Sequence, residues 1–542
     1  MNQRYVFTLL ASLGNLLSLC GRDSMRLTVL LMRQEYLKCS SPDNSSRSYH
    51  LPDNHPYLAS DTNAYPYLAS DTNPHPYLAS DNENRINLTA VNVQENTVFN
   101  VSDLVGWDEK SIVRRCGTIE YSELEIAAIR SAFNIGVMIT GVGGAFCDVF
   151  SGKKIMTVVG IVQGICNILI PTSAAICLPI LLFNQFVSGL AGGFVCACLT
   201  SMLARWEPSC ERGLLSTIIY TASPGCLVMT SLLTGITSQI TNWRSQYYGF
   251  GVIQLAWLVP WWFLVHDSPD IHPRINEKEK RLLLDHTDIA VSRPSISQIP
   301  LLRILLSPPV WGQIAANMGN IWVKSFYELL PQYLEELGVK MMFNGFVSAL
   351  PPLGSVIMGL LASRLFNWAN STHISLSLAR KISSSICLFG FSVLTASIPL
   401  LGPEPPTFII FVTTAAYFLT GFHLVGAMNN AIDLSPNYVG TILGINSFFM
   451  YLTSTTVSYS KVIALQVLDE SQVWPALFIL SCIIATSSNI VFLLLGSSEL
   501  QDWNMTAEPV KTVEDLNANI SEIITEKSST PNYGSANQYL ID

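Results

Sequence analysis

Long apolar runs separated by short polar turns fill most of the chain after residue 122. A helix needs about 20 apolar residues to cross the hydrocarbon core of a bilayer, and each run reaches that length. The runs form two groups on either side of a charged stretch, residues 267–306, which we expect to be a cytosolic central loop. The pattern predicts helices over 123–148, 153–175, 179–204, 214–238, 243–266, 307–333, 344–366, 380–401, 407–432, 437–463 and 473–497.

An earlier apolar run extends from Tyr5 to about Met32 and meets little charge before Arg22. A signal peptide is the competing interpretation, but it would be shorter and would end at a small-residue cleavage site. We therefore predict a first transmembrane helix here. The expected fold is an all-α membrane protein with twelve transmembrane helices in two six-helix bundles. The first bundle comprises residues 1–33 and 122–266, and the second comprises residues 307–497.

The segment between the first two helices, residues 34–121, is polar and contains a ten-residue repeat from His55 to Asn84. Each copy offers one Tyr-Leu pair, which is too little apolar surface for a core, so we predict a disordered loop. Cys39 and Cys116 bracket this loop, and whether they form a disulfide is left open. Glycosylation sequons favour a lumenal or extracellular position for the loop. These sequons begin at Asn44, Asn87 and Asn100.

The distribution of Lys and Arg gives the same orientation. With the sequon loop outside, the short outer loops carry little positive charge beyond Arg244 and Lys340, and the cytosolic loops carry most of it. Short cytosolic loops of membrane proteins are enriched in Lys and Arg, so both termini are expected in the cytosol. The polar segment 498–542 is predicted to be a disordered cytosolic tail. No sorting signal chooses between the plasma membrane and an acidic organelle.

The composition agrees with a membrane protein. Of the 542 residues, 49% are hydrophobic and 13% are charged, whereas soluble domains carry about 25% charged residues. The net charge of −9 argues against a nucleic-acid partner. No metal-ligand spacing, phosphate-binding loop or nucleophile elbow stands out in the sequence. We therefore expect neither an enzyme nor a cofactor or metal site.

A glycine-rich turn joins the second and third predicted helices. Its glycines allow helices to approach closely, and its charges can pin a short turn, although an ordinary basic turn is the alternative. Six helices, a central loop and six more helices is the layout of major-facilitator transporters, and the turn resembles their signature. That resemblance implies a cytosolic gate, braced by the loop after the fourth helix. The expected gating residues are Gly144, Asp148, Gly152, Lys153, Lys154, Glu211 and Arg212.

Further stretches resemble the anion–cation symporter family, whose members include sialin, the vesicular glutamate transporters and the sodium–phosphate cotransporters. These stretches are Trp206–Arg212, Asp267–Ile275, Ser348–Pro352, Asp433–Gly440 and Ser498–Trp503. The resemblance extends over the first helix and nearly everything beyond the repeat loop. It implies a secondary active transporter of small organic or inorganic anions, working by alternating access and coupled to a proton or sodium gradient. A transporter-like sensor or scaffold that moves no solute is the alternative.

Charged residues inside the predicted helices are candidate substrate contacts, because a charge in the bilayer interior is costly and is normally functional. Arg26 matches the family's helix-1 arginine, which is thought to meet the anion. Arg22 lies on the same helical face, and Asp23 could partly neutralise it. Lys324 and Glu328, spaced i and i+4 in the seventh helix, can pair with each other or line the cavity, and both interpretations stay open.

The fourth helix departs from the family pattern. Its arginine and glutamate positions fall on Gln185 and Gly192, so we identify the chain as a divergent member whose substrate cannot be copied from relatives. His423 is the only histidine predicted to lie inside the membrane; it suits a proton relay, although hydrogen-bonded packing is the alternative. The expected partners are a small anionic solute, a co-transported H⁺ or Na⁺ and the lipid bilayer, with the chain acting as a monomer.

Overall fold

The computed structural model describes residues 2–40, 121–206, 212–240, 243–285, 298–339, 341–371, 374–401 and 406–506. All regular structure within these ranges is helical. Several residues that the sequence singled out lie outside the described residues, so the structure says nothing of them. These are Asn44, Asn87, Asn100, Cys116 and Glu211, together with the side chains of Arg26, Cys39 and Arg212.

The N-terminal bundle has six membrane-crossing elements, as predicted. They are α1 (Gln3–Ser40), α2 (Glu123–Gly141) continued by η3 (Val142–Gly144) and α3 (Ala145–Val149), α4 (Gly152–Ile176), α5 (Leu178–Trp206), α6 (Arg212–Tyr220) with α7 (Ala222–Ile240), and α8 (Trp243–Leu264). Helix α1 is longer than predicted, because it continues past residue 33. Helix α4 begins directly after Ser151, whose side chain accepts a hydrogen bond from the Lys154 N–H as an N-cap.

The C-terminal bundle also has six crossing elements, two of them interrupted. They are α11 (Pro308–Tyr327) with α12 (Leu330–Glu336), α13 (Met341–Ser371), α14 (Leu376–Leu401), α15 (Pro406–Phe418) with α16 (Gly421–Val425) and α17 (Asn430–Leu434), α18 (Val439–Val467), and α19 (Glu470–Leu495). The first interruption precedes Pro331, which cannot continue a helical hydrogen-bond ladder. The second interrupted element is broken twice, at residues 419–420 and at residues 426–429, and the longer break begins at a glycine.

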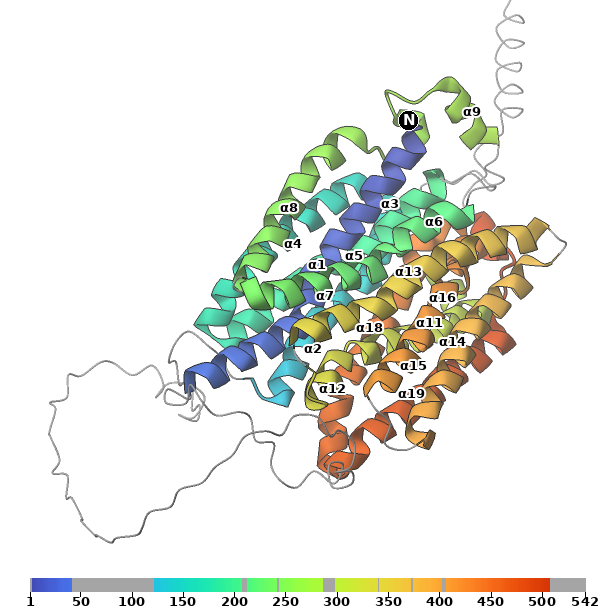
Figure 1. Cartoon of the computed structure of the whole chain (residues 1–542). Coiled ribbons are helices and arrows are strands. Elements are labelled where there is room, and N and C mark those ends of the chain that lie inside the picture. The colour runs from blue at the N-terminus through green and yellow to red at the C-terminus, as the bar shows by residue number, and fades with distance from the viewer. Residues whose placement is uncertain are drawn as a thin grey trace, which may run out of the picture. The chain divides into compact units, whose positions relative to one another are not determined.

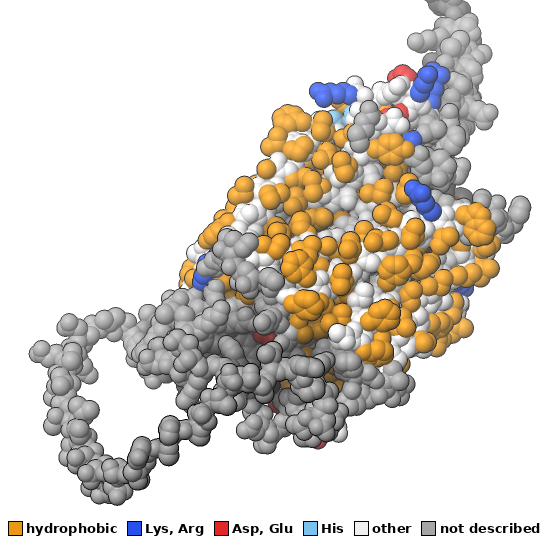
Figure 2. Space-filling view, in the orientation of Figure 1, with side chains coloured by type: hydrophobic (Ala, Val, Ile, Leu, Met, Phe, Trp, Pro, Cys, Tyr) orange, Lys and Arg blue, Asp and Glu red, His pale blue; other side chains and the backbone are white. Residues whose placement is uncertain are grey.

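Among the described residues, nine helical spans are long and apolar enough to cross a membrane by length and composition. Helices α8, α11 and α18 complete the twelve; each has at least 20 residues. Figure 2 shows hydrophobic side chains in a broad band over the face of the molecule that is turned to the viewer, with charged side chains gathered near the two ends of the helical bundles. Large apolar side chains such as Phe183, Val393 and Leu494 are exposed, as a lipid-facing surface requires.

The two bundles meet through paired helices: α2 packs on α18, and α7 packs on α13. In Figure 1 the chain's N-terminus and α3 lie toward the top, whereas α12 lies toward the bottom. We call the end that holds the N-terminus and α3 the Asp148 end; α1, α4, α11 and α18 begin there. The opposite Glu123 end holds the start of α2 and the end of α18. Both ends carry contacts between the bundles, described below.

The central loop is more than a solvated connection, because part of it is bound to the N-terminal bundle. It contains η4 (Pro269–Ile271), α9 (Glu277–Asp285) and α10 (Leu301–Leu306). The buried carboxylate of Glu279 accepts hydrogen bonds from the backbone N–H groups of Gln3 and Arg4, at 3.0 and 3.1 Å. Those donors have no partner within α1, so Glu279 caps the helix and attaches the loop to it.

The start of the tail corrects an expectation, because residues 498–506 are ordered against the C-terminal bundle rather than disordered. The segment ends in η7 (Asp502–Thr506). Trp503 is 6% exposed. The Asn504 side chain accepts hydrogen bonds from the Ser435 hydroxyl at 2.7 Å and from the Asn437 N–H at 3.2 Å. Burial of the Trp503 ring and the hydrogen bonds of the Asn504 side chain stabilise this segment, although its sequence is polar.

Candidate functional site

A charged pocket lies where the two bundles meet. Its walls come from α1, α2 and α5 on one side and from the C-terminal end of α11 on the other. The lining residues are Arg22, Asp23, Met25, Ile129, Arg130, Phe133, Asn134, Gln185 and Glu328. The pocket therefore brings together the predicted candidates Arg22, Gln185 and Glu328.

Arg22 is the centre of this pocket. Its guanidinium lies 2.5 Å from the carboxylate of Asp23 and 3.8 Å from that of Glu328, and it sits 5.8 Å from the centre of the Phe133 ring. The side chain of Asp23 is 1% exposed, so this ion pair is shielded from solvent. Asp23 and Glu328 belong to different bundles, and Arg22 therefore holds an ionic contact across their interface.

The structure does not pair Lys324 with Glu328. Glu328 is the C-cap residue of α11 and lies within ion-pair distance of Arg22 instead. Lys324 is half-buried and forms no ion pair with any described residue. The backbone at Glu328 is still helical, and its N–H donates to the Lys324 carbonyl oxygen at 3.1 Å, so helical spacing alone does not decide which partner the Glu328 side chain meets.

The departures of the fourth helix from the family pattern have a local structural counterpart. Gln185 is 2% exposed and lines the pocket. At Gly192, an added Cβ would lie 3.1 Å from the Gln163 amide nitrogen and 3.1 Å from the Phe133 ring. Gln163 thus fills the space beside a position where the family pattern has a carboxylate. A glutamate at this position needs its neighbours to move.

Gln163 belongs to a neutral amide network inside the N-terminal bundle. Its side-chain oxygen accepts hydrogen bonds from the Ser18 hydroxyl at 2.7 Å and from the Gln254 amide at 3.3 Å. The Asn167 amide donates to Gln254 at 3.0 Å. Satisfied networks of this kind connect membrane helices at little cost, because every polar group has a partner. The network carries no charge.

His423 is 1% exposed and lies in α16 of the C-terminal bundle, outside the charged pocket. Its Nε2 atom is 2.8 Å from the Asn317 side-chain oxygen, so an Nε2–H donates to that acceptor. The contact joins the interrupted crossing element α15–α17 to α11. The sequence left open a proton relay or a packed histidine, and this hydrogen bond fits both.

At the Asp148 end, one carboxylate bridges the bundles. Asp148 is 1% exposed, and it accepts hydrogen bonds from the Gly440 N–H at 2.9 Å and the Thr441 N–H at 2.8 Å. Those donors open α18, where the helix dipole also favours a negative charge. The contact requires close packing: a Cβ on Gly144 would lie 2.2 Å from the Gly440 carbonyl oxygen.

The remaining residues of the expected gate support the turn. A Cβ on Gly152 would lie 2.7 Å from the Met202 side chain, which would have to shift to make room for it. The Lys153 N–H donates to Asp267 at 2.9 Å, which attaches α4 to the central loop. The Lys153 ammonium lies 5.1 Å from the centre of the Trp262 ring. Lys154 is exposed and contributes its backbone N–H to Ser151.

A second charged contact closes the Glu123 end, and the sequence pattern did not predict it. The ammonium of Lys461, from α18, lies 3.5 Å from Glu123 in α2 and 2.7 Å from Glu336 in α12. The Trp474 indole N–H also donates to Glu336, at 2.7 Å. Gln332 donates to Glu123 at 3.0 Å. The sequence signal for this contact is a single lysine, Lys461, near the end of the predicted helix 437–463.

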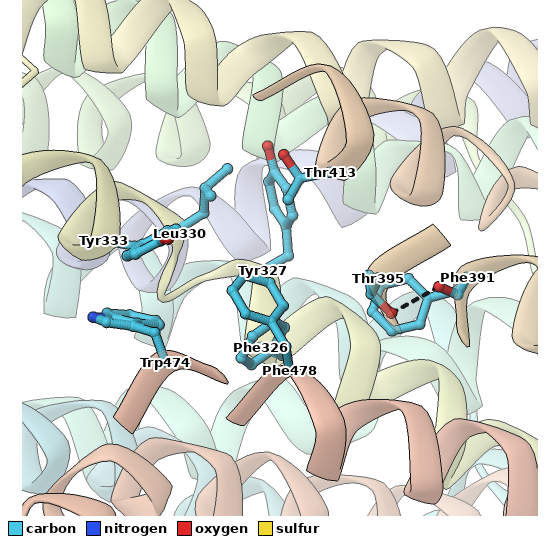
Figure 3. A pocket seen from close by; sticks show the side chains of 9 residues that line it. All are labelled: Phe326, Tyr327, Leu330, Tyr333, Phe391, Thr395, Thr413, Trp474 and Phe478. Atoms are coloured by element: carbon cyan, nitrogen blue, oxygen red, sulfur yellow. Dashed lines mark hydrogen bonds between the residues drawn. The ribbon is translucent and has the colours of Figure 1, made fainter. Parts of the chain in front are cut away.

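A separate pocket lies wholly within the C-terminal bundle and is mostly aromatic (Figure 3). Its lining residues are Phe326, Tyr327, Leu330, Tyr333, Phe391, Thr395, Thr413, Trp474 and Phe478. The rings of Tyr333 and Trp474 are 4.6 Å apart, and the Thr395 hydroxyl is bonded to the Phe391 carbonyl oxygen at 2.8 Å. None of these lining residues is charged.

Comparison with known proteins connects this geometry to a family. The family model described as "Major Facilitator Superfamily" matches residues 64–458. Human sialin is 29% identical over 383 residues, covering 69% of this chain and 76% of sialin. Vesicular glutamate transporter 1 of Bos taurus is 27% identical over 403 residues, covering 72% of this chain and 70% of that protein. Human sodium-dependent phosphate transport protein 1 is 28% identical, covering 69% and 80%.

A solved structure shows the same fold. The proton:xylose symporter XylE, bound to 6-bromo-6-deoxy-D-glucose, aligns with a TM-score of 0.59 over 93% of this chain and 98% of that chain. Its sequence is 11% identical, so the likeness concerns the fold alone. The relatives named above are members of the anion–cation symporter family, in agreement with the resemblance noted from the sequence.

Proposed function

Because this chain belongs to the Major Facilitator Superfamily, we propose that it is a secondary active transporter that carries a small organic or inorganic anion across a membrane by alternating access. One observation carries the proposal. Arg22 is held within α1 at the junction of the two bundles, paired with Asp23 and facing Glu328. A charge in that position is costly and is normally kept for function.

The ion pairs of Arg22 indicate how a bound anion would change the contact between the bundles. A carboxylate or phosphate that binds Arg22 competes with Glu328, whose contact at 3.8 Å is the weaker of the two ion pairs. Arginine is well suited to such an exchange, because its planar guanidinium binds oxyanions in a bidentate fashion. Losing Glu328 from Arg22 loosens an ionic contact between the bundles, so substrate binding and bundle movement are linked. Arg26 and Lys324 are further proposed contacts for the anion.

Alternating access is supported by the two charged contacts at opposite ends. Asp148 joins the bundles at one end, and Lys461 joins them at the other. We propose that each end opens in turn while the other stays closed, with Asp148, Gly144, Gly152, Lys153 and Lys154 as the gate on the cytosolic side. Glu211 and Arg212 are proposed to brace that gate.

Two of the relatives carry names that refer to glutamate and to phosphate, both of which are anions. A proton or sodium gradient is proposed as the driving force. His423 is one candidate for proton coupling. Asp23 is another, because it is 2% exposed and its Oδ2 atom has no hydrogen-bond partner among the described residues. Protonation would remove the charge of Asp23 when an anion occupies Arg22.

The orientation proposed from the sequence puts both termini in the cytosol, and both the plasma membrane and an acidic organelle fit it. A monomer is proposed, as the family resemblance implies. Replacing Asn44, Asn87 and Asn100 by Gln tests the orientation. If the loop is lumenal or extracellular, endoglycosidase treatment shifts the native protein on a gel and leaves the triple variant unchanged.

Uptake into proteoliposomes tests the transport function, with proton, sodium and potential gradients imposed one at a time. The panel is glutamate, aspartate, sialic acid, glucuronate, urate and phosphate. We expect accumulation of at least one anion, driven by one gradient, and a loss of about tenfold or more in Arg22→Ala, since a hydrogen bond to a charged group is worth about 1.5–3 kcal/mol. The matched control is Arg303→Ala, because Arg303 is exposed in α10.

The alternative is a transporter-like sensor or scaffold, and the neutral residues Gln185 and Gly192 favour it by leaving the fourth helix without a charge in the pocket. Thermal stabilisation by an anion, without uptake under any gradient, would support the sensor. Uptake that survives in folded Arg22→Ala protein would remove Arg22 from the site.

A further inference from the structure

The helix at the end of the central loop, α10, has an apolar outer face. Five of its six residues are aliphatic. The side chains of Leu302 and Leu306 are each 71% exposed, and Leu301 and Leu305 are exposed as well. At about 100° per residue these four leucines span an arc of about 140°, and the buried Ile304 lies on the other side of the helix. An apolar surface of this kind marks a contact with a membrane or with another protein.

The last turn of α10 is held against the start of α11. The indole N–H of Trp311 donates to the Leu305 carbonyl oxygen at 2.7 Å, and the Trp311 side chain is 38% exposed. A Cβ on Gly312 would lie 2.7 Å from the Gly496 nitrogen, so this turn of α11 packs against the end of α19. Leu494, near that end of α19, is 77% exposed, as a lipid-facing side chain is. The leucine face of α10 therefore adjoins the lipid-facing surface at the Asp148 end.

The charged residue and the tryptophan beside the leucine face fit a position at the membrane surface. Arg303 is exposed about 60° beyond Leu306, at the edge of the leucine arc. From that edge its long side chain reaches water while the leucines stay in the apolar layer. Tryptophan is enriched at membrane–water interfaces, which is where Trp311 lies when α10 rests on the bilayer. A helix divided into apolar and polar sides in this way is typical of one that lies in the plane of the interface.

The segment around α10 also contacts α18, the helix whose first turn binds Asp148. Before α10, the Gln298 carbonyl oxygen accepts a hydrogen bond from the Tyr438 hydroxyl at 3.3 Å, and Tyr438 is the N-cap residue of α18. After α10, the rings of Trp311 and Phe449 are 5.2 Å apart, and Phe449 belongs to α18. Both sides of the α10 segment are thus attached to the helix that closes the Asp148 end.

We propose that α10 is an interfacial helix whose leucine face is embedded among the lipid acyl chains of the leaflet at the Asp148 end. This anchor holds the start of α18 in position for its contact with Asp148. The central loop is then attached to the membrane at its far end instead of lying wholly in water. The anchor stands without reference to any solute, and only its effect on the gate rests on the proposed function.

Two diazirine probes test the anchor on the full native chain in lipid vesicles, one dissolved in the bilayer and one in water. Each probe labels what it touches on illumination, and mass spectrometry of peptides locates the label. We expect the bilayer probe to label residues 301–306 within about threefold of the α19 residues around Leu494, because both surfaces meet acyl chains. The exposed Arg281 region of α9 is the internal control and should be labelled at least about tenfold less.

Two outcomes would reject the anchor. Labelling of residues 301–306 mainly by the water-soluble probe would place the leucines in water. Protection of these residues from both probes would place a partner protein, or another segment of this chain, over the leucine face. In either case lipid is not what covers α10.

Paired substitutions test the effect on the gate. Ser447 of α18 is 6% exposed, and its Cβ would lie 3.3 Å from a Cβ on Gly141, so Ser447→Cys reports opening of the bundle interface. Adding Leu302→Gln with Leu306→Gln should raise the rate at which N-ethylmaleimide labels this cysteine several-fold, because polar side chains weaken the hold on the bilayer. Leu302→Met with Leu306→Met keeps the face apolar and should label as slowly as the parent.

Thermal stability in detergent keeps this test apart from simple damage to the fold. Both leucines are mostly exposed, so the paired Gln variant should melt within a few degrees of the parent. Equal labelling of the cysteine in the Gln pair, the Met pair and the parent would reject the role of α10 in holding α18. Neither the diazirine nor the maleimide experiment needs a transported solute, so failure of the anchor is distinguished from failure of the transport function.

Discussion

Asp148 accepts two hydrogen bonds from Thr441, one from its N–H at 2.8 Å and one from its hydroxyl at 2.9 Å, although the two residues belong to opposite bundles. Both bonds reach the same carboxylate oxygen. The contact is available only while the bundles are together at this end, so it stabilises one closed state and no other. Its loss should therefore change the balance between states rather than the binding of solute.

Asp148→Asn should weaken closure at this end, because the charge that faces the N-terminus of α18 is removed. Each hydrogen bond to a charged group contributes about 1.5–3 kcal/mol. We expect at least about tenfold slower uptake with little change in KM. The matched variant Thr441→Val removes the hydroxyl bond and keeps the N–H bond, so its effect should be smaller. Equal effects of the two variants would show that the charge of Asp148 is unimportant.

Lys461→Met should open the opposite end, because it removes the cation between Glu123 and Glu336. Ser454 bonds to Asn134 across the same interface, and a cysteine introduced there reports access. We expect a membrane-impermeant thiol reagent to label Ser454→Cys several-fold faster when Lys461→Met is also present. Lys461→Arg, which keeps the charge, is the control and should label as slowly as the parent. Equal labelling rates in Ser454→Cys alone, with Lys461→Met and with Lys461→Arg would mean that Lys461 does not hold this end closed.

Arg380 and Asp433 form a buried ion pair in the C-terminal bundle, 2.8 Å apart, with both side chains 3% exposed. Asp433→Ala leaves the arginine without its counter-charge, which costs about 3–5 kcal/mol for a buried pair. The melting temperature should fall accordingly. Replacing both residues, by Arg380→Met with Asp433→Leu, should recover part of the loss. A double variant less stable than Asp433→Ala alone would contradict this account.

The docked start of the tail predicts a boundary for truncation. A chain that ends after residue 506 keeps Trp503 and Asn504 in place and should match the full chain in melting temperature. Trp503→Ala should be less stable by about 3–5 kcal/mol, the usual cost of removing a buried tryptophan side chain. Thermal unfolding in detergent measures both. A truncation after residue 497 that remains as stable as the full chain would show that this segment is dispensable.

Much of the fold could be predicted because membrane helices are encoded locally. A long apolar run specifies a crossing element whatever its neighbours are, so the twelve elements follow from the sequence alone. The Asp148 turn was equally accessible, since its glycines and charges lie together in the chain. The sequence pattern does not show that the carboxylate reaches Gly440 and Thr441, which lie almost 300 positions away.

The misses have a common cause, which is that the deciding partner is distant in sequence. The sequence left two interpretations open for Lys324 and Glu328, and it could not choose between them because Arg22, which faces Glu328, comes from α1. Residues 498–506 looked like a polar tail because Ser435 and Asn437, their bonding partners, lie in another loop. The interruption at residues 426–429 was missed because its composition is mostly apolar and suits a helix.

The contact between Gly144 and α18 has a consequence for experiments on the cycle. A Cβ on Gly444 would lie 2.3 Å from the Gly141 carbonyl oxygen, and one on Gly144 would meet Gly440 as closely. A single methyl group at either position would act as a wedge between the bundles. It would prevent the Asp148 end from shutting without touching a charge or the solute pocket, and would trap the protein in one half of its working cycle.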